Sequence, residues 1–140
     1  MKKELKRPGG KDNYATLTYE KENSLIYLDW NGYLSVDLVK AGSEELLLMI
    51  KDTRANRVLV DNRKVTGPWQ QANEWYQNDW NPRAAKDGLT DMAVIMSDNI
   101  FTQLSLQGFT KVTQGVYTVG VFNAEPQARE WILKQPVLAK

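Results

Sequence analysis

The amino-acid sequence predicts an α/β domain: a mainly parallel five-stranded sheet with an antiparallel opening hairpin strand, covered by about four helices. After two neighbouring strand patterns, short apolar runs alternate with amphipathic helical patterns, which is the order of βαβ units. The apolar run over residues 92–96 is unbroken and predicts a central strand buried on both faces. The polar alternation over residues 14–19 instead predicts a strand at or near an edge. A length of 140 residues suits one domain with its own core.

The opening hairpin is predicted from two alternating segments. Residues 14–19 and 24–30 each alternate apolar and polar side chains, which is the period of a half-buried strand. The polar residues 20–23 between them form the turn. Asn31 and Gly32 end the second strand.

A helix and a buried strand follow the hairpin. Ser35 is a favourable N-cap for a helix that runs to about residue 52. Gly42 weakens this helix by about 1 kcal/mol relative to alanine, which allows a kink or a break there. The β-branched run over residues 57–61 is the third strand, and it ends on Asp61.

The next segment carries an aromatic stripe at helical spacing. Pro68, after Gly67, is in the position that proline favours in the first turn of a helix. The stripe, with spacings of three, four and four, consists of Trp69, Ala72, Tyr76 and Trp80. Pro82 disfavours helical geometry at Asn81, so we expect an interruption there before a short helix over residues 82–86.

The last third of the chain adds two helices around one strand. Ser97 or Asp98 caps the first helix, and Gly108 ends it. Residues 116–122 form the last strand, and Asn123 caps the final helix.

The sequence contains no cysteine and no histidine. This composition excludes disulfides, cysteine nucleophiles, Ser-His-Asp catalysis and most transition-metal sites. We therefore predict no metal and no cofactor. An enzyme would have to rely on carboxylates, Lys, Tyr, Ser or Thr.

Charge is unevenly distributed along the chain, although the net charge is only +1. Residues 1–13 contain five basic and two acidic side chains, a net charge of +3, together with the run Pro8-Gly9-Gly10. We expect a flexible basic N-terminal tail over residues 1–13 and a single domain over residues 14–140. No basic patch continues into the domain, so we predict no nucleic-acid partner.

No membrane segment is predicted. The longest apolar stretch, residues 46–50, is far too short to cross a bilayer. The N-terminal charges are not followed by an apolar core, so no signal peptide is expected. These features indicate a soluble cytoplasmic protein.

The candidate site lies after the third strand, because α/β proteins bind ligands at the carboxyl ends of their strands. Residues 62–67 are predicted to form a loop between Asp61 and the aromatic helix. The candidate ligand- or partner-binding residues are Asp61, Asn62, Arg63, Thr66, Trp69, Trp75, Tyr76 and Trp80. Two roles remain open for Asp61, which either faces a ligand or holds loop amides and Arg63.

Trp75 lies off the aromatic stripe, so not all of these rings can be buried against one sheet. The stripe itself is a core-facing surface or one wall of a ligand site. Trp75 either meets another chain or caps a pocket. Because aromatic residues are enriched at the cores of interfaces, we predict a homodimer.

Two segments resemble the SpoIIAA-like family, which is similar to the STAS domains of anti-sigma factor antagonists and related to CRAL-TRIO folds. They are Val58-Leu59-Val60-Asp61-Asn62-Arg63 and the closing Phe122-Asn123-Ala124-Glu125 with Ala128-Arg129-Glu130-Trp131-Ile132. The resemblance covers about residues 14–133. It implies a small regulatory or binding domain.

The chain departs from this family at the switch segment. Anti-sigma factor antagonists carry an Asp-Ser-Ser-Gly-like segment with a phosphorylated serine, whereas residues 61–67 contain no serine. Thr66 is the remaining hydroxyl group near the next helix. It is a candidate phosphorylation site beside Arg63 and Lys64, or it caps the helix.

Three functional classes follow. The first is a non-catalytic STAS-like protein-interaction module, and the second is a carrier or sensor of a small apolar, lipid-like molecule. An enzyme ranks last, because the sequence lacks a recognisable acid–base set. A closed aromatic cavity would favour the second class, and a flat exposed aromatic patch would favour the first.

Overall fold

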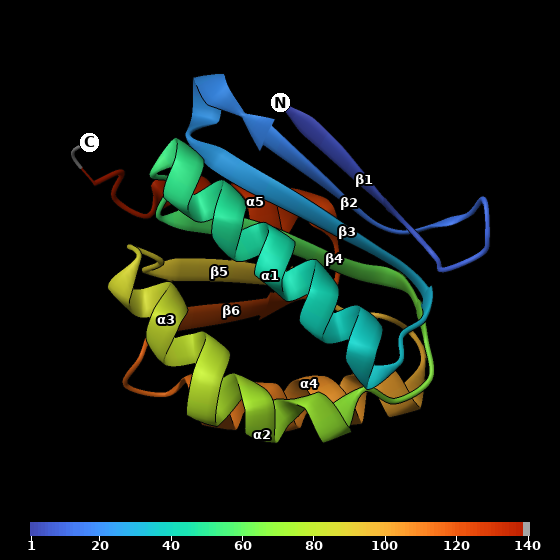
Figure 1. Cartoon of the computed structure of the whole chain (residues 1–140). Helices are drawn as coiled ribbons and strands as arrows, with labels where there is room; N and C mark the ends of the chain where they lie inside the picture. Colours follow the sequence, from blue (N-terminus) through green and yellow to red (C-terminus); the bar gives the residue numbers. More distant parts are fainter. Residues whose placement is uncertain (139–140) are drawn as a thin grey trace.

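The computed structural model describes residues 1–138 and contains one six-stranded sheet with helices on both faces (Figure 1). The strands lie side by side in chain order, the first three antiparallel and the last three parallel to the third. They are β1 (Lys2–Lys6), β2 (Asn13–Glu20), β3 (Leu25–Tyr33), β4 (Arg57–Thr66), β5 (Asp91–Ile95) and β6 (Thr118–Phe122). The predicted α/β class is confirmed.

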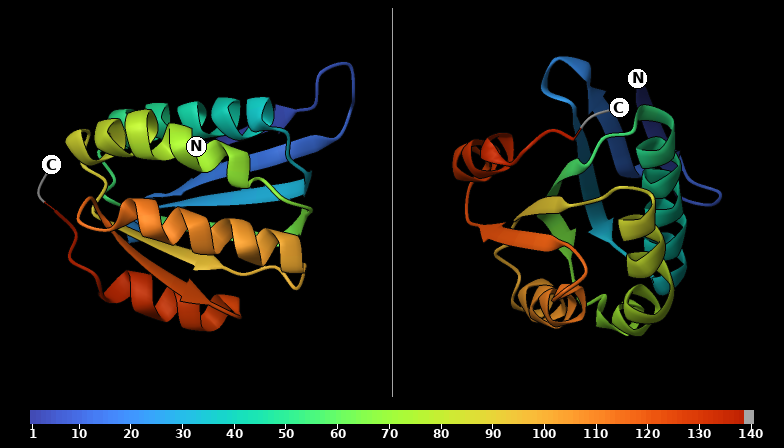
Figure 2. Two further views of the ribbon diagram at one scale, coloured as in Figure 1. Left: turned by 90° about the horizontal axis from the view of Figure 1, so that it is seen from below. Right: turned by 90° about the vertical axis from the view of Figure 1, so that its left-hand side faces the viewer.

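The helices are divided unequally between the two faces (Figure 2). Successive parallel strands step in one direction across the sheet, so right-handed crossovers place their helices on the same face. That face carries α1 (Val36–Thr53), a helical run that ends in α3 (Asn81–Lys86), and α4 (Ile100–Thr113). The last helix, α5 (Glu125–Lys134), covers the other face with a smaller core.

The chain forms an edge strand where the sequence predicts a flexible tail. β1 pairs antiparallel with β2, which adds a sixth strand to the five expected. The guanidinium group of Arg7 donates to the carbonyl oxygens of Asn31 (2.7 Å) and Tyr33 (2.9 Å), and Lys3 pairs with Glu45. Backbone pairing, which composition does not reveal, therefore orders this basic segment.

The central strand and the first long helix agree with the prediction. β5 lies between β4 and β6, and each of its residues is buried. The Ser35 side chain caps α1 by accepting a hydrogen bond from the amide of Leu38 (3.2 Å). Gly42 does not interrupt α1; instead it lies against the ring of Trp30.

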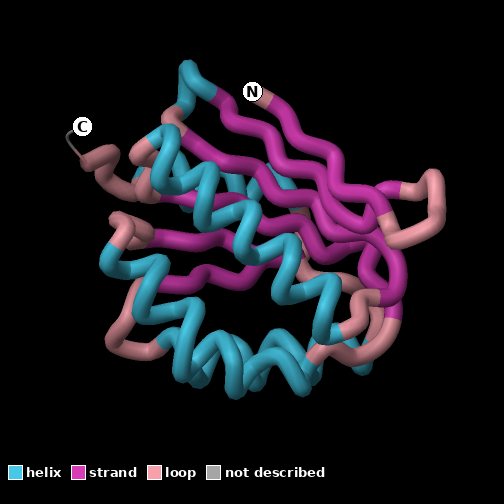
Figure 3. The backbone as a smooth tube through the Cα atoms, in the orientation of Figure 1, coloured by secondary structure: helices cyan, strands magenta, loops and turns pink. Residues whose placement is uncertain are grey.

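The helical run between β4 and β5 is continuous rather than interrupted at Asn81 (Figure 3). It passes through a 3₁₀ turn (Gln70–Ala72), α2 (Asn73–Trp75) and a π-helical turn (Tyr76–Trp80) into α3. The amide of Asn81 bonds to the carbonyl of Tyr76, five residues back. The widened π turn accommodates the missing donor and the bulk of Pro82 without breaking the helix.

The ends of the last two helices differ from prediction. Asn99, not Ser97 or Asp98, caps α4 by accepting from the amides of Phe101 and Thr102. α4 continues through Gly108 to Thr113. The N-cap residue of α5 is Ala124, which has no side-chain cap, instead of Asn123.

Candidate functional site

β4 is longer than the sequence predicts, and this changes the site. Residues 62–66 continue the strand instead of forming a loop. They extend past the last β4–β5 pair, Asp61 with Ile95. Residues 62 and 63 lie at an irregularity between Asp29 and Asn31 of β3, and residues 64–66 then pair with β3 again. Because neighbouring side chains of a strand point to opposite faces, the predicted site residues are divided between two faces of the sheet.

Asp61 lies on the α5 face, in a saturated hydrogen-bond network. It accepts from the hydroxyl of Tyr27 (2.6 Å) and from Nη2 of Arg63 (2.7 Å). Arg63 also pairs with Glu125 of α5 (3.0 Å). Burial alone would raise the pKa of Asp61, but the hydrogen bonds from Arg63 and Tyr27 outweigh it and hold the pKa below its ordinary value.

The same network fastens α5 to the sheet. Arg129 forms two hydrogen bonds with Glu20 of β2, at 2.6 and 2.8 Å, and one with Glu125 at 3.0 Å. Its guanidinium group lies 5.6 Å from the centroid of the Tyr27 ring. Asp61 and Arg63 therefore have the structural role that the sequence left open for them.

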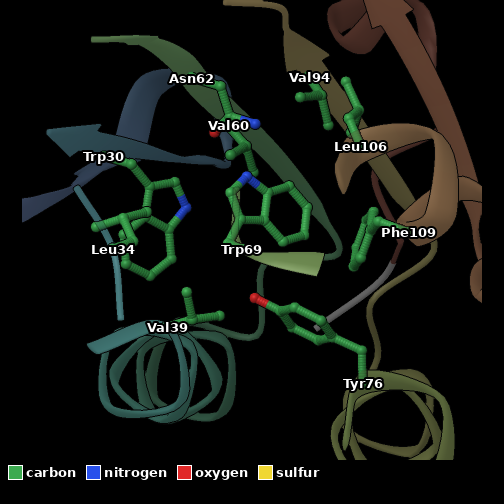
Figure 4. A pocket seen from close by; sticks show the side chains of 10 residues that line it. All are labelled: Trp30, Leu34, Val39, Val60, Asn62, Trp69, Tyr76, Val94, Leu106 and Phe109. Carbon is green, nitrogen blue, oxygen red and sulfur yellow. The ribbon is translucent and has the colours of Figure 1, made fainter. Parts of the chain in front are cut away.

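Asn62 points to the opposite face, where the structure contains a small cavity that is partly open to the surface (Figure 4). The cavity volume is about 40 Å³, enough for about three water molecules. It lies between the sheet, α1, α4 and the start of the helical run. Ten residues line it: Trp30, Leu34, Val39, Val60, Asn62, Trp69, Tyr76, Val94, Leu106 and Phe109.

The cavity contains polar groups without protein partners. Only 4 % of Asn62 is exposed, and no hydrogen bond within residues 1–138 involves its side-chain amide. The amide is not among the fully buried polar atoms that lack a partner, so it faces space that water can reach. The same is true of the indole N–H groups of Trp30 and Trp69 within the described chain. By contrast, the hydroxyl of Tyr76 lies 2.7 Å from that of Ser43.

The aromatic rings of the cavity pack edge to face. The rings of Trp69, Tyr76 and Phe109 contact one another, with centroids 4.9–6.5 Å apart. Burial raises the pKa of Tyr76, so its hydroxyl stays neutral at physiological pH. None of the ten lining residues carries a charge, and the cavity is therefore suited to a neutral occupant.

A surface groove adjoins the cavity. It has a volume of about 290 Å³ and shares Leu34 and Trp69 with the cavity. The groove residues are Tyr33, Leu34, Ser35, Val36, Pro68, Trp69, Gln70 and Gln71. Leu34 and Trp69 thus line both spaces.

The remaining predicted site residues lie away from the cavity. Trp80 is 1 % exposed and belongs to the core, where its indole N–H donates to the carbonyl of Ser43 (2.8 Å). Trp75 is half-buried, with the ammonium group of Lys40 5.8 Å from its ring centroid. Thr66 is exposed at the end of β4, and its side chain caps no helix within the described residues.

Sequence reasoning missed the other side of the cavity. Trp30 was predicted only as a strand residue, and Phe109 lies beyond the predicted end of its helix. One signal was present in the sequence: Gly42 within a long helix indicates close approach of a bulky group. That group is the ring of Trp30.

Residues 1–138 bring together no group of three side chains of the metal-ligating types. No helix among them is long and apolar enough to cross a bilayer.

Comparison of the chain with protein-family models, with curated proteins and with solved structures finds no match in any of the three. The fold and the cavity are therefore the basis for the function proposed below.

Proposed function

We propose that this domain binds a small, mainly apolar molecule in the cavity beneath Trp69, as a carrier or sensor. The observation that carries the proposal is the side-chain amide of Asn62, a residue only 4 % exposed, which faces an aromatic cavity without a protein partner. An amide that is cut off from water without gaining a hydrogen bond costs about 1–3 kcal/mol, so this group at a cavity wall requires water or a ligand as its partner. The recessed aromatic lining also favours this class over a flat docking patch.

The occupant enters through the groove. A volume of about 40 Å³ is too small for an aromatic ring while Trp69 stays in place. Movement of the Trp69 side chain joins the cavity to the groove of about 290 Å³. Trp69 follows Gly67, whose φ is +82°, and Pro68, and precedes a short 3₁₀ turn. The ring is thus attached to a connecting segment rather than to the middle of a long helix.

A second candidate is the non-catalytic interaction module that the SpoIIAA-like resemblance implies. One observation favours it: α4 exposes three large apolar side chains near its start. They are Ile100, Phe101 and Leu104, with exposed fractions of 57 %, 56 % and 47 %. Exposed apolar patches of this kind mark protein-interaction surfaces.

Two measurements test the ligand-binding proposal. Native mass spectrometry of the purified protein reports retained small molecules and subunit number together. A titration with acetophenone and α-methylstyrene, followed by ¹H–¹⁵N correlation spectra of the tryptophan indole groups, reports binding at the cavity. We expect at least one probe to shift the Trp30 and Trp69 signals.

A pair of matched variants locates the binding. Val94→Phe fills the cavity and should abolish the shifts, whereas Val116→Phe, at a position 37 % exposed, should preserve them. Thermal melting verifies that both variants fold. The proposal fails if neither probe binds and the purified protein retains no small molecule.

A further inference from the structure

The cavity presents hydrogen-bond donors from three residues to the same small space. Asn62 contributes its amide from β4, and Trp30 and Trp69 contribute indole N–H groups from β3 and from the segment after β4 (Figure 4). In Figure 4 the nitrogen of Trp30 lies on the side of its ring that faces Trp69. An indole N–H donates and cannot accept, so these two groups require an acceptor.

The cavity lining also favours a neutral ligand over a charged one. The edge of an aromatic ring carries the positive end of its quadrupole, so inward-facing indole N–H groups disfavour a cation. An anion would be buried without a cationic partner, because no lysine or arginine lines the cavity. A neutral acceptor satisfies the donors without that cost.

We propose that the ligand is a neutral carbonyl compound whose oxygen accepts hydrogen bonds from Trp30, Asn62 and Trp69. This inference rests on the proposed ligand-binding function and adds the chemical class that the cavity selects. The carbonyl oxygen occupies the inner cavity, and the apolar body of the ligand extends past Leu34 into the groove. The groove offers both apolar surface and the side-chain amides of Gln70 and Gln71.

Water is the competing occupant. A cavity of about 40 Å³ with several free donors can hold ordered water, which would satisfy the same groups. A carbonyl compound that binds must displace this water and reproduce its hydrogen bonds. An apolar isostere displaces the water without replacing those bonds, so the comparison of the two isolates the contribution of the carbonyl oxygen.

The test compares acetophenone with α-methylstyrene, which replaces the carbonyl oxygen by a methylene group of similar shape. The five indole N–H signals of ¹⁵N-labelled protein are followed, and Trp30→Phe and Trp69→Phe identify the two cavity signals. We expect acetophenone to bind about tenfold more tightly, a difference of about 1.4 kcal/mol. Its binding should shift the Trp30 and Trp69 signals and leave that of Trp80, which already donates to Ser43, in place.

Asn62→Leu supplies the matched variant. It keeps the approximate size of the side chain and removes the amide, so the preference for acetophenone should fall at least threefold. Asn78→Leu changes an exposed asparagine outside the cavity and should retain the full preference. Benzoate and benzylammonium, the charged counterparts, should bind at least tenfold more weakly than acetophenone.

The outcomes separate the two proposals. Equal binding of acetophenone and α-methylstyrene at the cavity overturns carbonyl recognition and leaves the ligand-binding function intact. Tighter binding of benzoate or benzylammonium overturns the neutral class. If no probe shifts the cavity signals, carbonyl recognition fails, and if the purified protein also retains no small molecule, the ligand-binding function fails with it.

Discussion

A Cβ atom at position 42 of α1 would lie 2.6 Å from Cζ3 of Trp30, so Gly42 is what allows the tryptophan ring to rest against the helix. The contact places Trp30 as one wall of the cavity, and the ring also stacks on that of Tyr14. A residue that looks unfavourable within a helix thus has a packing role.

Gly42→Ala should destabilise the protein although alanine is the better helix former. The substitution gains about 1 kcal/mol of helix propensity, but overpacking against the Trp30 ring costs about 1–3 kcal/mol. We expect a net loss of about 1 kcal/mol in the free energy of unfolding, measured by urea denaturation.

The control removes the ring. In a Trp30→Leu background the same Gly42→Ala substitution should stabilise the protein by up to about 1 kcal/mol, because only helix propensity remains. An equal loss in both backgrounds would show that the steric explanation is wrong.

Asn62→Leu should raise the stability of the ligand-free protein. Leucine is compatible with the apolar lining, and its introduction removes a buried amide without a protein partner, so we expect a gain of about 1 kcal/mol. Thermal melting with calorimetry measures it. Asn56 is the matched control, because it is also buried but donates to Thr90 (2.8 Å) and Pro136 (2.9 Å). Asn56→Leu should instead lower the free energy of unfolding by about 2 kcal/mol. A loss of similar size for Asn62→Leu would contradict the conclusion that the Asn62 amide has no protein partner.

The spacing of apolar residues along the sequence predicted most of the fold, because a helix or strand that is buried must carry apolar side chains on its buried face. The unbroken apolar run of β5 and the aromatic stripe of Trp69, Ala72, Tyr76 and Trp80 are each buried as expected. β1 could not be predicted in this way. Its Lys-rich sequence has one apolar side chain facing the core, the partly buried Leu5, and the strand is ordered mainly by backbone hydrogen bonds to β2 and by Arg7.

The site was predicted only in part, for a related reason. Residues 62–66 contain a single buried apolar side chain after Asn62, Val65, and therefore resemble a polar loop. Pairing with β3 keeps them extended, and strand alternation then sends Asp61 and Asn62 to opposite faces. Sequence position placed these two residues together, whereas the strand separates their side chains.

Replacement of Trp80 and of Trp75 by alanine should lower the free energy of unfolding by different amounts. Trp80→Ala removes a ring that is 1 % exposed and leaves the carbonyl of Ser43 without its donor, so we expect a loss of about 3–5 kcal/mol. Trp75 is half-buried at the surface, so Trp75→Ala should cost about 1 kcal/mol. Urea denaturation of both variants measures the difference. A cost of 3 kcal/mol or more at Trp75 would place it in the core.

Self-association through the surface around Trp75 remains a prediction. A half-buried tryptophan beside Lys40 is the kind of side chain that interfaces enrich. Sedimentation equilibrium should detect a species of twice 16.0 kDa, and Trp75→Ala should shift the protein toward the monomer. Ile100→Ala, at an exposed apolar residue of α4, serves as the comparison. A monomer alone at high micromolar concentration would contradict the prediction.

Acid should weaken the connection between the sheet and α5 through Asp61. Hydrogen bonds from Arg63 and Tyr27 overcome the effect of burial and hold the pKa of Asp61 below its ordinary value, which is about 3.9 in unfolded chains. A carboxyl group with a lowered folded-state pKa stabilises the protein above the unfolded-state value, and this contribution is lost as the pH falls through the folded-state pKa. Asp61→Asn should therefore lower the free energy of unfolding by about 1–2 kcal/mol at pH 7, and the difference from the wild type should become smaller below about pH 4.

Urea denaturation at the two pH values measures this difference in the free energy of unfolding. Asp98→Asn, at an exposed position, is the matched control. A difference that stays constant between these pH values would show that Asp61 does not bind Arg63 as a carboxylate.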